Sequence, residues 1–307
     1  MVRSVGSVSD EKIAICEVGP RDGLQNETTV LSVSDRVGLI DRLAGSGLTL
    51  IEAASFVSPT LVPQMARSEE VLSSLNRAGG IRYAGLVLNK RGAERALAAK
   101  VDMIRFVVPA TDSFSRRNQG MTSRASVAEF AEVVALARAS GTDCVATIAV
   151  AFGCPFEGRV PPSRVVQLAD ELTAAGATEV IIADTIGVAI PDQVSGLFAD
   201  VAARLGATPL GGHFHNTRNS GLANCLAAAN AGAQVLDASV GGIGGCPFAP
   251  RATGNVPTED LTYMLGSRLQ GRVDFVALID TANWLQERLG RPLPGMLMKA
   301  GPFPLST

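Results

Sequence analysis

Aromatic residues, charge imbalance and long apolar runs are all scarce in this sequence of 307 residues, and each scarcity excludes a class of protein. Phe, Trp and Tyr together make up 5% of the chain, too few for the stacking surface that binds single-stranded nucleic acid. The formal net charge is −2, so no general attraction to nucleic acid or to an anionic membrane is expected. No apolar run reaches the roughly 18 residues of a membrane-spanning helix. We therefore expect a small-molecule partner, and neither a nucleic acid nor a membrane.

Signals for export and for lipid attachment are also missing. The first residues, MVRSVGSVSDEK, contain early acids and no apolar stretch, unlike a signal peptide or an organellar presequence. The last residues, PFPLST, match no lipidation or retention signal. Five cysteines, an odd and sparse number, are more typical of a reducing compartment than of a disulfide framework. These features predict a cytoplasmic protein.

Short apolar segments alternate along the chain with longer segments of helical period. The apolar segments are hydrophobic throughout, as in strands that are buried on both faces of a parallel sheet. Predicted helices such as 34–47, 126–141 and 162–176 follow them, and the last two begin near a Ser and end at a Gly. The predicted strands are 13–18, 50–55, 83–88, 103–108, 145–150, 179–184, 211–215 and 235–240.

Eight strand–helix units within roughly 250 residues predict an α/β fold of the (β/α)₈ TIM-barrel type, with an open doubly wound sheet as the alternative. Hydrophobic residues make up 47% of the chain, enough to fill one large core. No linker or low-complexity segment divides the sequence. We expect a single catalytic domain over residues 1–307, with the barrel over about 12–270 and a short C-terminal helical appendage over about 271–307.

Unusual polar residues gather at the carboxyl ends of the predicted strands, the rim that carries the active site in TIM barrels. The first strand runs into GPRDGLQNE, the second contains an acid, and the sixth ends in one. The seventh carries both histidines of the chain, and a Gly-rich loop with a cysteine follows the eighth. The candidate residues are Arg21, Asp22, Gln25, Glu52, Asp184, His213, His215, Cys246 and Asn255.

His213 and His215 stand two residues apart on one predicted strand, so both imidazoles point to the same side. Two core histidines bonded to backbone carbonyls are the alternative. The polar run after them and Asp22 on another strand end favour metal ligation. Without a thiolate ligand, such a set suits Mg²⁺ or Mn²⁺ better than Zn²⁺. A substrate hydroxyl on such a cation loses its proton easily, and Asp22 or His213 is placed to accept it.

Arg21, next to Asp22, is a fixed cation that can stabilise a developing enolate oxygen. The alternative role of Arg21 is an ion pair with Glu52 inside the barrel, and the two roles can coexist. Acids at strand ends, Glu52 and Asp184, are more often orienting partners than primary catalytic groups. Cys246 follows four glycines and precedes a proline, which predicts a mobile flap whose thiol can protonate an enolate carbon. A small buried loop residue is the alternative for this cysteine.

The other cysteines and the glycine-rich run indicate no further chemistry. Cys16, Cys144 and Cys225 fall within predicted elements and are expected to fill the core, and Cys154 in FGCPFEG is expected to be structural. GGIGG lacks the spacing of a dinucleotide-binding fingerprint, so a Rossmann dehydrogenase is disfavoured.

From about Ile13 to Trp284 the sequence resembles the hydroxymethylglutaryl-CoA lyase family. The matching stretches are EVGPRDGLQNE, IEAASFVSPTLVPQM, SFSRRN, FGCPFEG, DTIGV, GHFHNT and GGIGGCPFA…TGNVPTEDL, of which GPRDGLQNE and GGCPF are specific. The resemblance implies metal-dependent cleavage of 3-hydroxy-3-methylglutaryl-CoA to acetyl-CoA and acetoacetate, and a homodimer.

The resemblance also implies a role for each site residue. The implied metal ligands are Asp22, His213, His215 and Asn255, the last suggested by the resemblance alone. Arg21 would face the enolate oxygen, Cys246 would supply a proton from a mobile loop, and Glu52 and Gln25 would support the site. The substrate-binding candidates are Arg21, Gln25, Asp184, Arg116 and Arg117, with the last two near the CoA phosphates.

Six positions in four segments depart from the family pattern, so the reaction type is better indicated than the acyl group. Asn216 and Arg218 follow the second histidine where an Asp and an aromatic residue are usual. Ile181 replaces a small hydroxyl residue, Thr147 replaces a tyrosine, and Pro250–Arg251 replaces a Gln-Gly pair. A citramalyl-CoA-type lyase, a Claisen-condensing synthase and a non-enzymatic binding barrel are the alternatives. The synthases carry a long C-terminal region for which this sequence has no room.

Overall fold

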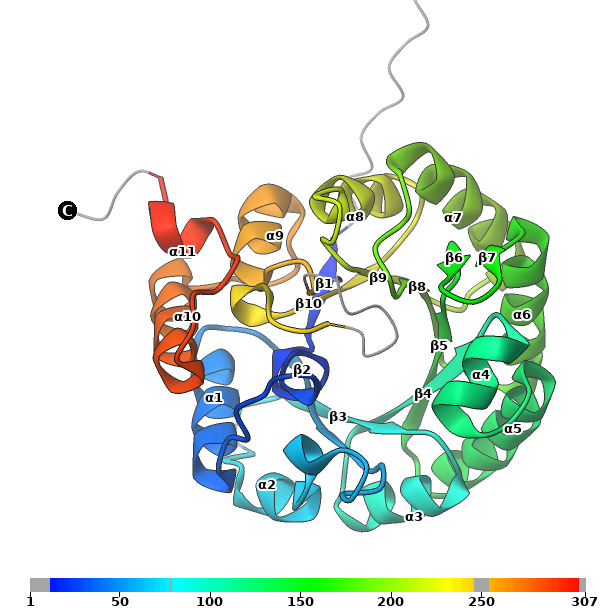
Figure 1. Cartoon of the computed structure of the whole chain (residues 1–307), viewed down its shortest axis with the longest axis horizontal. Helices are drawn as coiled ribbons and strands as arrows, with labels where there is room; N and C mark the ends of the chain where they lie inside the picture. The colour runs from blue at the N-terminus through cyan, green and yellow to red at the C-terminus, as the bar shows by residue number, and fades with distance from the viewer. Residues whose placement is uncertain (1–11, 78, 246–253, 304–307) are drawn as a thin grey trace, which may run out of the picture.

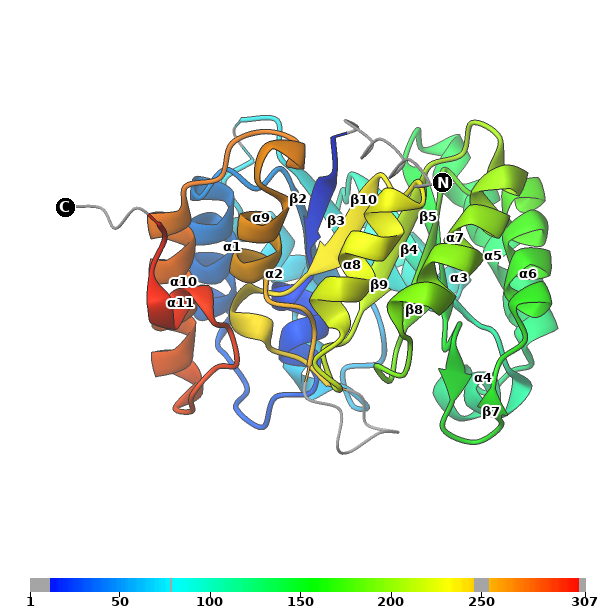
Figure 2. The same cartoon turned by 90° about the horizontal axis from the view of Figure 1, so that it is seen from above.

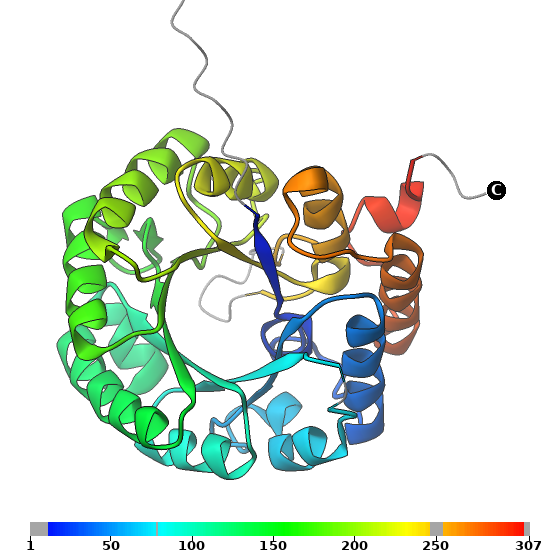
Figure 3. The same cartoon turned by 180° about the vertical axis from the view of Figure 1, so that it is seen from behind.

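The computed structural model describes residues 12–77, 79–245 and 254–303, and its central feature is a closed barrel of parallel strands. The strands follow the order β1-β10-β9-β8-β5-β4-β3-β2 around the ring, which closes where β1 pairs with β10 (Figures 1 and 3). All eight predicted strands and the TIM barrel are confirmed, and the open sheet is excluded. The barrel strands are β1 (Ala14–Glu17), β2 (Leu50–Ser55), β3 (Arg82–Val87), β4 (Met103–Pro109), β5 (Asp143–Ala149), β8 (Glu179–Asp184), β9 (Leu210–Phe214) and β10 (Val235–Ala238).

Helices surround the barrel and cover the outer face of its strands (Figure 1). The helix α4 (Asp112–Gln119) and a small hairpin project at one end of the barrel (Figure 2). The hairpin pairs β6 (Gly153–Cys154) with β7 (Gly158–Arg159). None of the described helices is both long and apolar enough to cross a membrane. The α-helices are α1 (Val33–Gly45), α2 (Ser68–Ser74), α3 (Lys90–Ala98), α4 (Asp112–Gln119), α5 (Ser123–Ala139), α6 (Pro162–Ala175), α7 (Pro191–Leu205), α8 (Gly221–Asn230), α9 (Thr258–Leu265), α10 (Phe275–Leu289) and α11 (Leu297–Ala300).

The helix ends follow local capping chemistry, with two differences from the prediction. α5 begins three residues earlier than expected, because the Thr122 hydroxyl accepts the amide of Ala125. α6 begins at Pro162, whose missing amide hydrogen costs nothing in a first turn, so Ser163 is not its cap. The predicted C-terminal helix is α10, which begins after Asp274 as its cap and packs against α1 on the outside of the barrel.

The barrel interior is layered because each strand sends every second side chain inward. On β4, Met103 lies near the amino end of the strand, Arg105 in the middle and Val107 near the carboxyl end. Met103 belongs to an apolar cluster, whereas Arg105 and Val107 line a cavity. The barrel therefore has an apolar floor beneath a polar pocket at the carboxyl ends of the strands. The buried members of the apolar cluster are Ala84, Met103, Val145 and Ile181.

Candidate active site

The pocket above the apolar floor has a volume of about 240 Å³ and contains most of the residues predicted from the sequence. One wall is polar and comes from β1, β9 and β10 with the loops that follow them. The other wall is largely apolar and comes from β3, β4, α4 and the loop after β2. The predicted residues in the lining are Arg21, Asp22, Gln25, Glu52, His213 and His215.

A π-helical turn, η1 (Gly19–Gly23), follows β1 and carries Arg21 and Asp22 into the pocket. Glu17, fully buried, holds this turn: its carboxylate accepts the amides of Gly19 and Val240 at 2.7 and 3.0 Å and the Thr258 hydroxyl at 2.6 Å. A Cβ atom at position 19 would lie 2.6 Å from Glu17 Oε1, so any other residue there would displace the carboxylate that holds the turn. The loop after the first strand is thus bonded to the loop after the last one.

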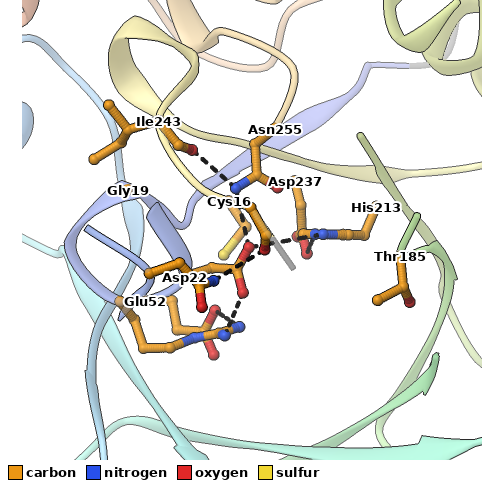
Figure 4. Close-up of polar contacts among 12 residues, drawn as sticks. Cys16, Gly19, Asp22, Glu52, Thr185, His213, Asp237, Ile243 and Asn255 are labelled. Atoms are coloured by element: carbon orange, nitrogen blue, oxygen red, sulfur yellow. Dashed lines mark hydrogen bonds and ion pairs between the residues drawn. The ribbon is translucent and has the colours of Figure 1, made fainter. Parts of the chain in front are cut away.

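Asp22, His213 and His215 converge at the polar wall. Each offers one ligand atom, and these atoms lie within 4.8 Å of one another. The two imidazoles share one side of β9 and the loop after it, as their spacing predicted, with ring centroids 5.2 Å apart. His213 Nε2 lies 3.9 Å from Asp22 Oδ2, and Figure 4 shows the two side chains turned toward each other. These three residues can hold a metal ion.

Asn255 lies beside this cluster although 233 residues separate it from Asp22. Its amide nitrogen donates to Asp22 Oδ2 at 2.9 Å and to the Ile243 carbonyl at 3.1 Å (Figure 4). A single antiparallel bridge pairs His215 with Asn255, which aligns the two residues through their backbones. Since the amide nitrogen is the donating atom, the side-chain oxygen of Asn255 remains available as a ligand.

The polar wall rests on a buried network around Arg105 and Asp237. The Arg105 Nη2 atom donates to both carboxylate oxygens of Asp237 at 2.9 Å, and Asp237 Oδ2 lies 3.0 Å from His213 Nδ1. An ionised carboxylate only accepts hydrogen bonds, so Nδ1 carries the proton and Nε2 keeps its lone pair toward Asp22. This carboxylate–imidazole arrangement is the one that orients metal-binding histidines.

Arg21 bridges two acids at the edge of the same network. Its guanidinium donates to Asp22 Oδ1 at 2.5 Å and to Glu52 Oε2 at 2.8 Å. Glu52 is fully buried, whereas Arg21 is 9% exposed and lines the pocket. The ion pair between Arg21 and Glu52 is therefore present, and Arg21 still faces the cavity.

The neighbouring charges set the protonation states of the cluster. Burial alone would raise the pKa of the Asp22 carboxyl, but Arg21 and the two histidines hold it well below its usual value. Burial opposes the charged form of His213, yet the hydrogen bond and charge of Asp237 raise its pKa. Burial and the adjacent His213 lower the pKa of His215 to about 4, so this imidazole is neutral at pH 7 and can donate its lone pair.

Among the buried polar atoms that have no hydrogen-bond partner in the described residues are His215 Nδ1, Gln25 Oε1 and Glu52 Oε1. Such atoms are rare in folded proteins unless a ligand, water or ion satisfies them. All three belong to residues that line the pocket. A divalent cation with substrate oxygens would fit this unsatisfied polar wall.

The opposite wall is suited to a longer, less polar part of a ligand. Its lining includes Val57, Leu61 and Leu86, together with Phe114 and Asn118 from α4. The two arginines predicted to bind CoA phosphates are on the same helix but outside the lining. Arg116, 62% exposed in its side chain, pairs with Asp112 at 4.0 Å, and the Arg117 guanidinium lies over the Phe156 ring. They lie on the helix that borders the pocket.

Two predicted residues do not join the cluster in the described structure. Asp184 is buried behind the lining, where its oxygens accept the amides of Val188 and Ala189 at 2.9 Å each. This geometry supports the loop after β8, and Asp184 is not part of the pocket lining. Cys246, like Pro250 and Arg251, lies outside the described residues, so its role as a proton donor stays a prediction.

The glycines before Cys246 have a structural reason of their own. Gly241, Gly242 and Gly244 all adopt positive φ angles, of 67°, 73° and 128°. A Cβ atom at Gly244 would lie 2.4 Å from the amide nitrogen of Asn255. This part of the glycine-rich run is required for close packing against the site, and mobility is not needed to explain it.

The departures from the family pattern differ in their distance from the pocket. Thr147 lines it, whereas Ile181 lies one layer below in the apolar floor. Asn216 accepts the Gly221 amide, and Arg218 donates to the Gly187 carbonyl, so both stabilise loops. Of the described departures, only Thr147 reaches the lining.

Sequence reasoning missed Arg105, Asp237 and Glu17. Each is a charged residue inside an otherwise apolar strand, in MIRFVV, VLDA and AICE. A buried charge is costly unless it is paired, so a lone charge in such a strand is a signal of a partner across the barrel. That signal was present, but the partner could not be identified without the strand register. Cys16, predicted to fill the core, is buried as expected and contacts Arg105 Nη1 at 3.2 Å.

Comparisons with known proteins agree with this geometry. The (R)-citramalyl-CoA lyase of Chloroflexus aurantiacus is 43% identical over 303 residues, with 95% of this chain and 96% of that protein covered. The hydroxymethylglutaryl-CoA lyase of Pseudomonas mevalonii is 42% identical over 281 residues, covering 91% and 93%. The solved structure of an HMG-CoA lyase from Acinetobacter baumannii, in complex with coenzyme A and 3-methylmalate, has a TM-score of 0.92 and 38% identity and covers 97% and 98%.

A TIM barrel whose relatives are lyases over nearly their whole length, with an acid–histidine cluster in its mouth, is a carbon–carbon lyase. This excludes the interpretation as a binding module and disfavours a condensing synthase. The sequence model of the HMGL-like family matches residues 12–285, and the chain belongs to that family.

Proposed function

We propose that this protein cleaves 3-hydroxy-3-methylglutaryl-CoA to acetyl-CoA and acetoacetate by a metal-dependent retro-Claisen reaction. The observation that carries the proposal is the convergence of Asp22, His213 and His215 beside Arg21 on one wall of the pocket. Similarity to lyases of 3-hydroxyacyl-CoA esters supports the same reaction. We further propose a cytoplasmic homodimer. The described cysteines Cys16, Cys144, Cys154 and Cys225 are free thiols, which agrees with a reducing compartment.

Asp22, His213, His215 and the side-chain oxygen of Asn255 are the proposed ligands of the cation, Mg²⁺ or Mn²⁺. When bound, the cation would polarise the hydroxyl and carbonyl oxygens of the substrate and make the hydroxyl proton easier to remove. Oxygen and neutral imidazole donors without a thiolate favour these hard cations over Zn²⁺.

The protein groups around that position supply the remaining steps. Of the two groups expected to accept the hydroxyl proton, Asp22 is the proposed acceptor, because His213 with its proton on Nδ1 and Nε2 at the metal position has no free lone pair. The bond between the second and third acyl carbons then breaks. The electron pair of that bond passes to the thioester as an enolate, whose oxygen is stabilised by the fixed positive charge of Arg21. Protonation of the enolate carbon, for which Cys246 is the proposed donor, yields acetyl-CoA.

Two further groups of residues are proposed to position the substrate. Glu52 holds the Arg21 guanidinium, and Gln25, with its unsatisfied side-chain oxygen, supports the polar end of the acyl group. The apolar wall would accompany the pantetheine arm toward α4. Arg116 and Arg117 on that helix are the proposed partners of the CoA phosphates.

A second candidate substrate is citramalyl-CoA, which the same chemistry would cleave to acetyl-CoA and pyruvate. It is favoured by the 43% identity to the citramalyl-CoA lyase of Chloroflexus aurantiacus. The two esters differ in the length of the acyl group beyond the tertiary alcohol, and not in the bond that breaks. Neither candidate alters the proposed roles of the polar wall.

The proposal is tested by measuring acetyl-CoA release from a panel of 3-hydroxyacyl-CoA esters that includes both candidates, with Mg²⁺ or Mn²⁺ added to chelator-treated protein. Cleavage of 3-hydroxy-3-methylglutaryl-CoA with the highest kcat/KM is expected. Preference for citramalyl-CoA would support the second candidate, and no cleavage of any ester would refute the function.

A matched pair of variants connects activity to the site. Asp22→Asn removes a proposed ligand, whereas Asp143→Asn removes an acid paired with Arg82 at the amino end of β5, far from the pocket lining. Loss of cleavage is expected for the first variant alone. Equal activity in both variants would contradict the proposed cluster.

A further inference from the structure

The polar wall depends on a second buried arginine that touches none of the proposed ligands. Arg105 comes from the middle of β4, across the barrel, and is 2% exposed. Its Nη2 atom donates to both oxygens of Asp237 at 2.9 Å, and its Nη1 atom lies 3.5 Å from Glu52 Oε2. Among the described residues, no other Arg or Lys pairs with Asp237.

Through these two acids Arg105 reaches both halves of the site. Asp237 leads to His213, whose Nδ1 atom lies 3.0 Å from its carboxylate, on the side of the proposed metal. Glu52 leads to Arg21, which donates to it at 2.8 Å, on the side of the proposed enolate. The Arg105 guanidinium is therefore the junction of a chain of contacts from His213 to Arg21.

The junction also balances charge among side chains that lie at the base of the pocket. Three acids (Asp22, Glu52 and Asp237) and two arginines (Arg21 and Arg105) lie together, all of them buried except the partly exposed Asp22, and their charges sum to one negative charge before any cation is added. Without Arg105, Asp237 would have no cationic partner apart from His213, and Glu52 would keep only Arg21. An unpaired buried carboxylate reorients or recruits a proton, so its neighbour would lose its orientation as well.

We propose that Arg105 is a positioning residue of the active site: it fixes Asp237 and Glu52 so that His213 presents Nε2 to the metal position and Arg21 faces the enolate position. The metal position and the enolate position in this statement both rest on the proposed metal-dependent function. The planar, forked guanidinium is required because it donates in two directions at once, which the single ammonium of lysine cannot do with the same geometry.

The tautomer of His213 tests the orientation without any metal or substrate. The chain contains two histidines, so a long-range ¹H–¹⁵N spectrum of the metal-free protein at alkaline pH contains two imidazole systems. We expect His213 to carry its proton on Nδ1 in the natural protein. Asp237→Asn offers Arg105 only one oxygen and turns its NH₂ toward the imidazole, so the proton is expected to move to Nε2. An unchanged tautomer in Asp237→Asn would overturn the proposed geometry.

Metal affinity tests the residue itself. Arg105→Lys keeps the charge and is expected to weaken Mn²⁺ binding, measured by calorimetry on the full chain, about 10- to 100-fold, the usual effect of removing a partner behind a metal ligand. Arg36→Lys is the matched control, because Arg36 is also 2% exposed but lies on α1 and donates to the Ala66 carbonyl. Binding by Arg105→Lys that equals that of the control and the natural protein would overturn the proposal.

The two measurements separate this proposal from the metal site on which it partly rests. If the natural protein binds no Mn²⁺, the metal site fails, whereas the tautomer spectra still support or refute the role of the Arg105–Asp237 pair. Circular dichroism establishes that each variant is folded. If Arg105→Lys does not fold, Asp237→Asn, which is nearly isosteric, supplies the same Mn²⁺ titration and is expected to show the same loss, and unweakened binding would overturn the proposal.

Discussion

Replacing Arg21 by methionine is the sharpest test of the electrostatic part of the mechanism. The substitution removes the cation proposed for the enolate oxygen and keeps a side chain of similar length. In other enzymes, loss of one donor to a developing oxyanion lowers kcat about 10²- to 10³-fold, or about 2.7–4 kcal/mol. We expect a loss of that size in kcat for acetyl-CoA release, with a smaller change in KM.

The same substitution also disturbs stability, and the structure indicates by how much. Arg21 pairs with Asp22 at 2.5 Å and with the fully buried Glu52 at 2.8 Å. Breaking a buried pair from one side costs roughly 3–5 kcal/mol of the free energy of unfolding, because a charge stays behind without its partner. Arg105, at 3.5 Å from Glu52, offsets part of this cost. Urea unfolding measures the difference.

A double variant separates the two effects. Arg21→Met with Glu52→Gln removes the fully buried one of the two acids that Arg21 pairs with, so stability should partly recover relative to Arg21→Met alone, while kcat should remain low. Glu52→Gln alone is the control for the second change. Recovery of kcat together with stability would refute the reasoning, because it would mean that Arg21 acts on the fold and not on the transition state.

The remaining predictions concern the metal, the flap cysteine and a buried acid. Excess chelator should abolish cleavage, and Mg²⁺ or Mn²⁺ should restore it; full activity in chelator would contradict the metal mechanism. Cys246→Ala should lower kcat by about 10²- to 10⁴-fold with little change in the unfolding midpoint, and a natural rate would leave that cysteine without a catalytic role. Burial raises the pKa of the Glu259 carboxyl to about 8, although hydrogen bonds from backbone amides act to lower it. The folded state therefore favours the neutral acid. The corresponding stability is fully present below the ordinary pKa of 4.5 and is lost as pH rises toward 8, by at most about 1.4 kcal/mol per pH unit. In urea unfolding at pH 5 and pH 8, Glu259→Gln should flatten this dependence, and an unaltered slope would assign it to another group.

The strands and the polar rim were predictable because their signals are local. Continuous apolar runs such as EVIIAD are required wherever a strand is covered on both faces, and the spacing of His213 and His215 fixes their common direction. The helix starts were less predictable, since Thr122 caps α5 upstream of the expected position and competes with several nearby hydroxyl residues. Capping depends on a single hydrogen bond, and a sequence offers several candidates for it.

The supporting residues could not be predicted for a different reason. Arg105 and Asp237 are 132 residues apart, and their pairing depends on how strands on opposite sides of the barrel align. Asp184 illustrates the opposite case: its position at a strand end suggested contact with substrate, but the backbone amides of Val188 and Ala189 satisfy it locally. Position on the rim is set by the strand, whereas the direction of a side chain is set by its nearest donors.

The bond network of Glu17 has a consequence for how the protein is made. This carboxylate joins the turn after β1 to Val240 and Thr258, and Asp22 meets Asn255 across the same seam. A chain that leaves the ribosome from its amino end presents Arg21 and Asp22 among the first segments and Asn255 among the last. The reactive centre therefore cannot assemble before residue 255 has been added, and a truncated translation product that ends before this residue lacks one side of it.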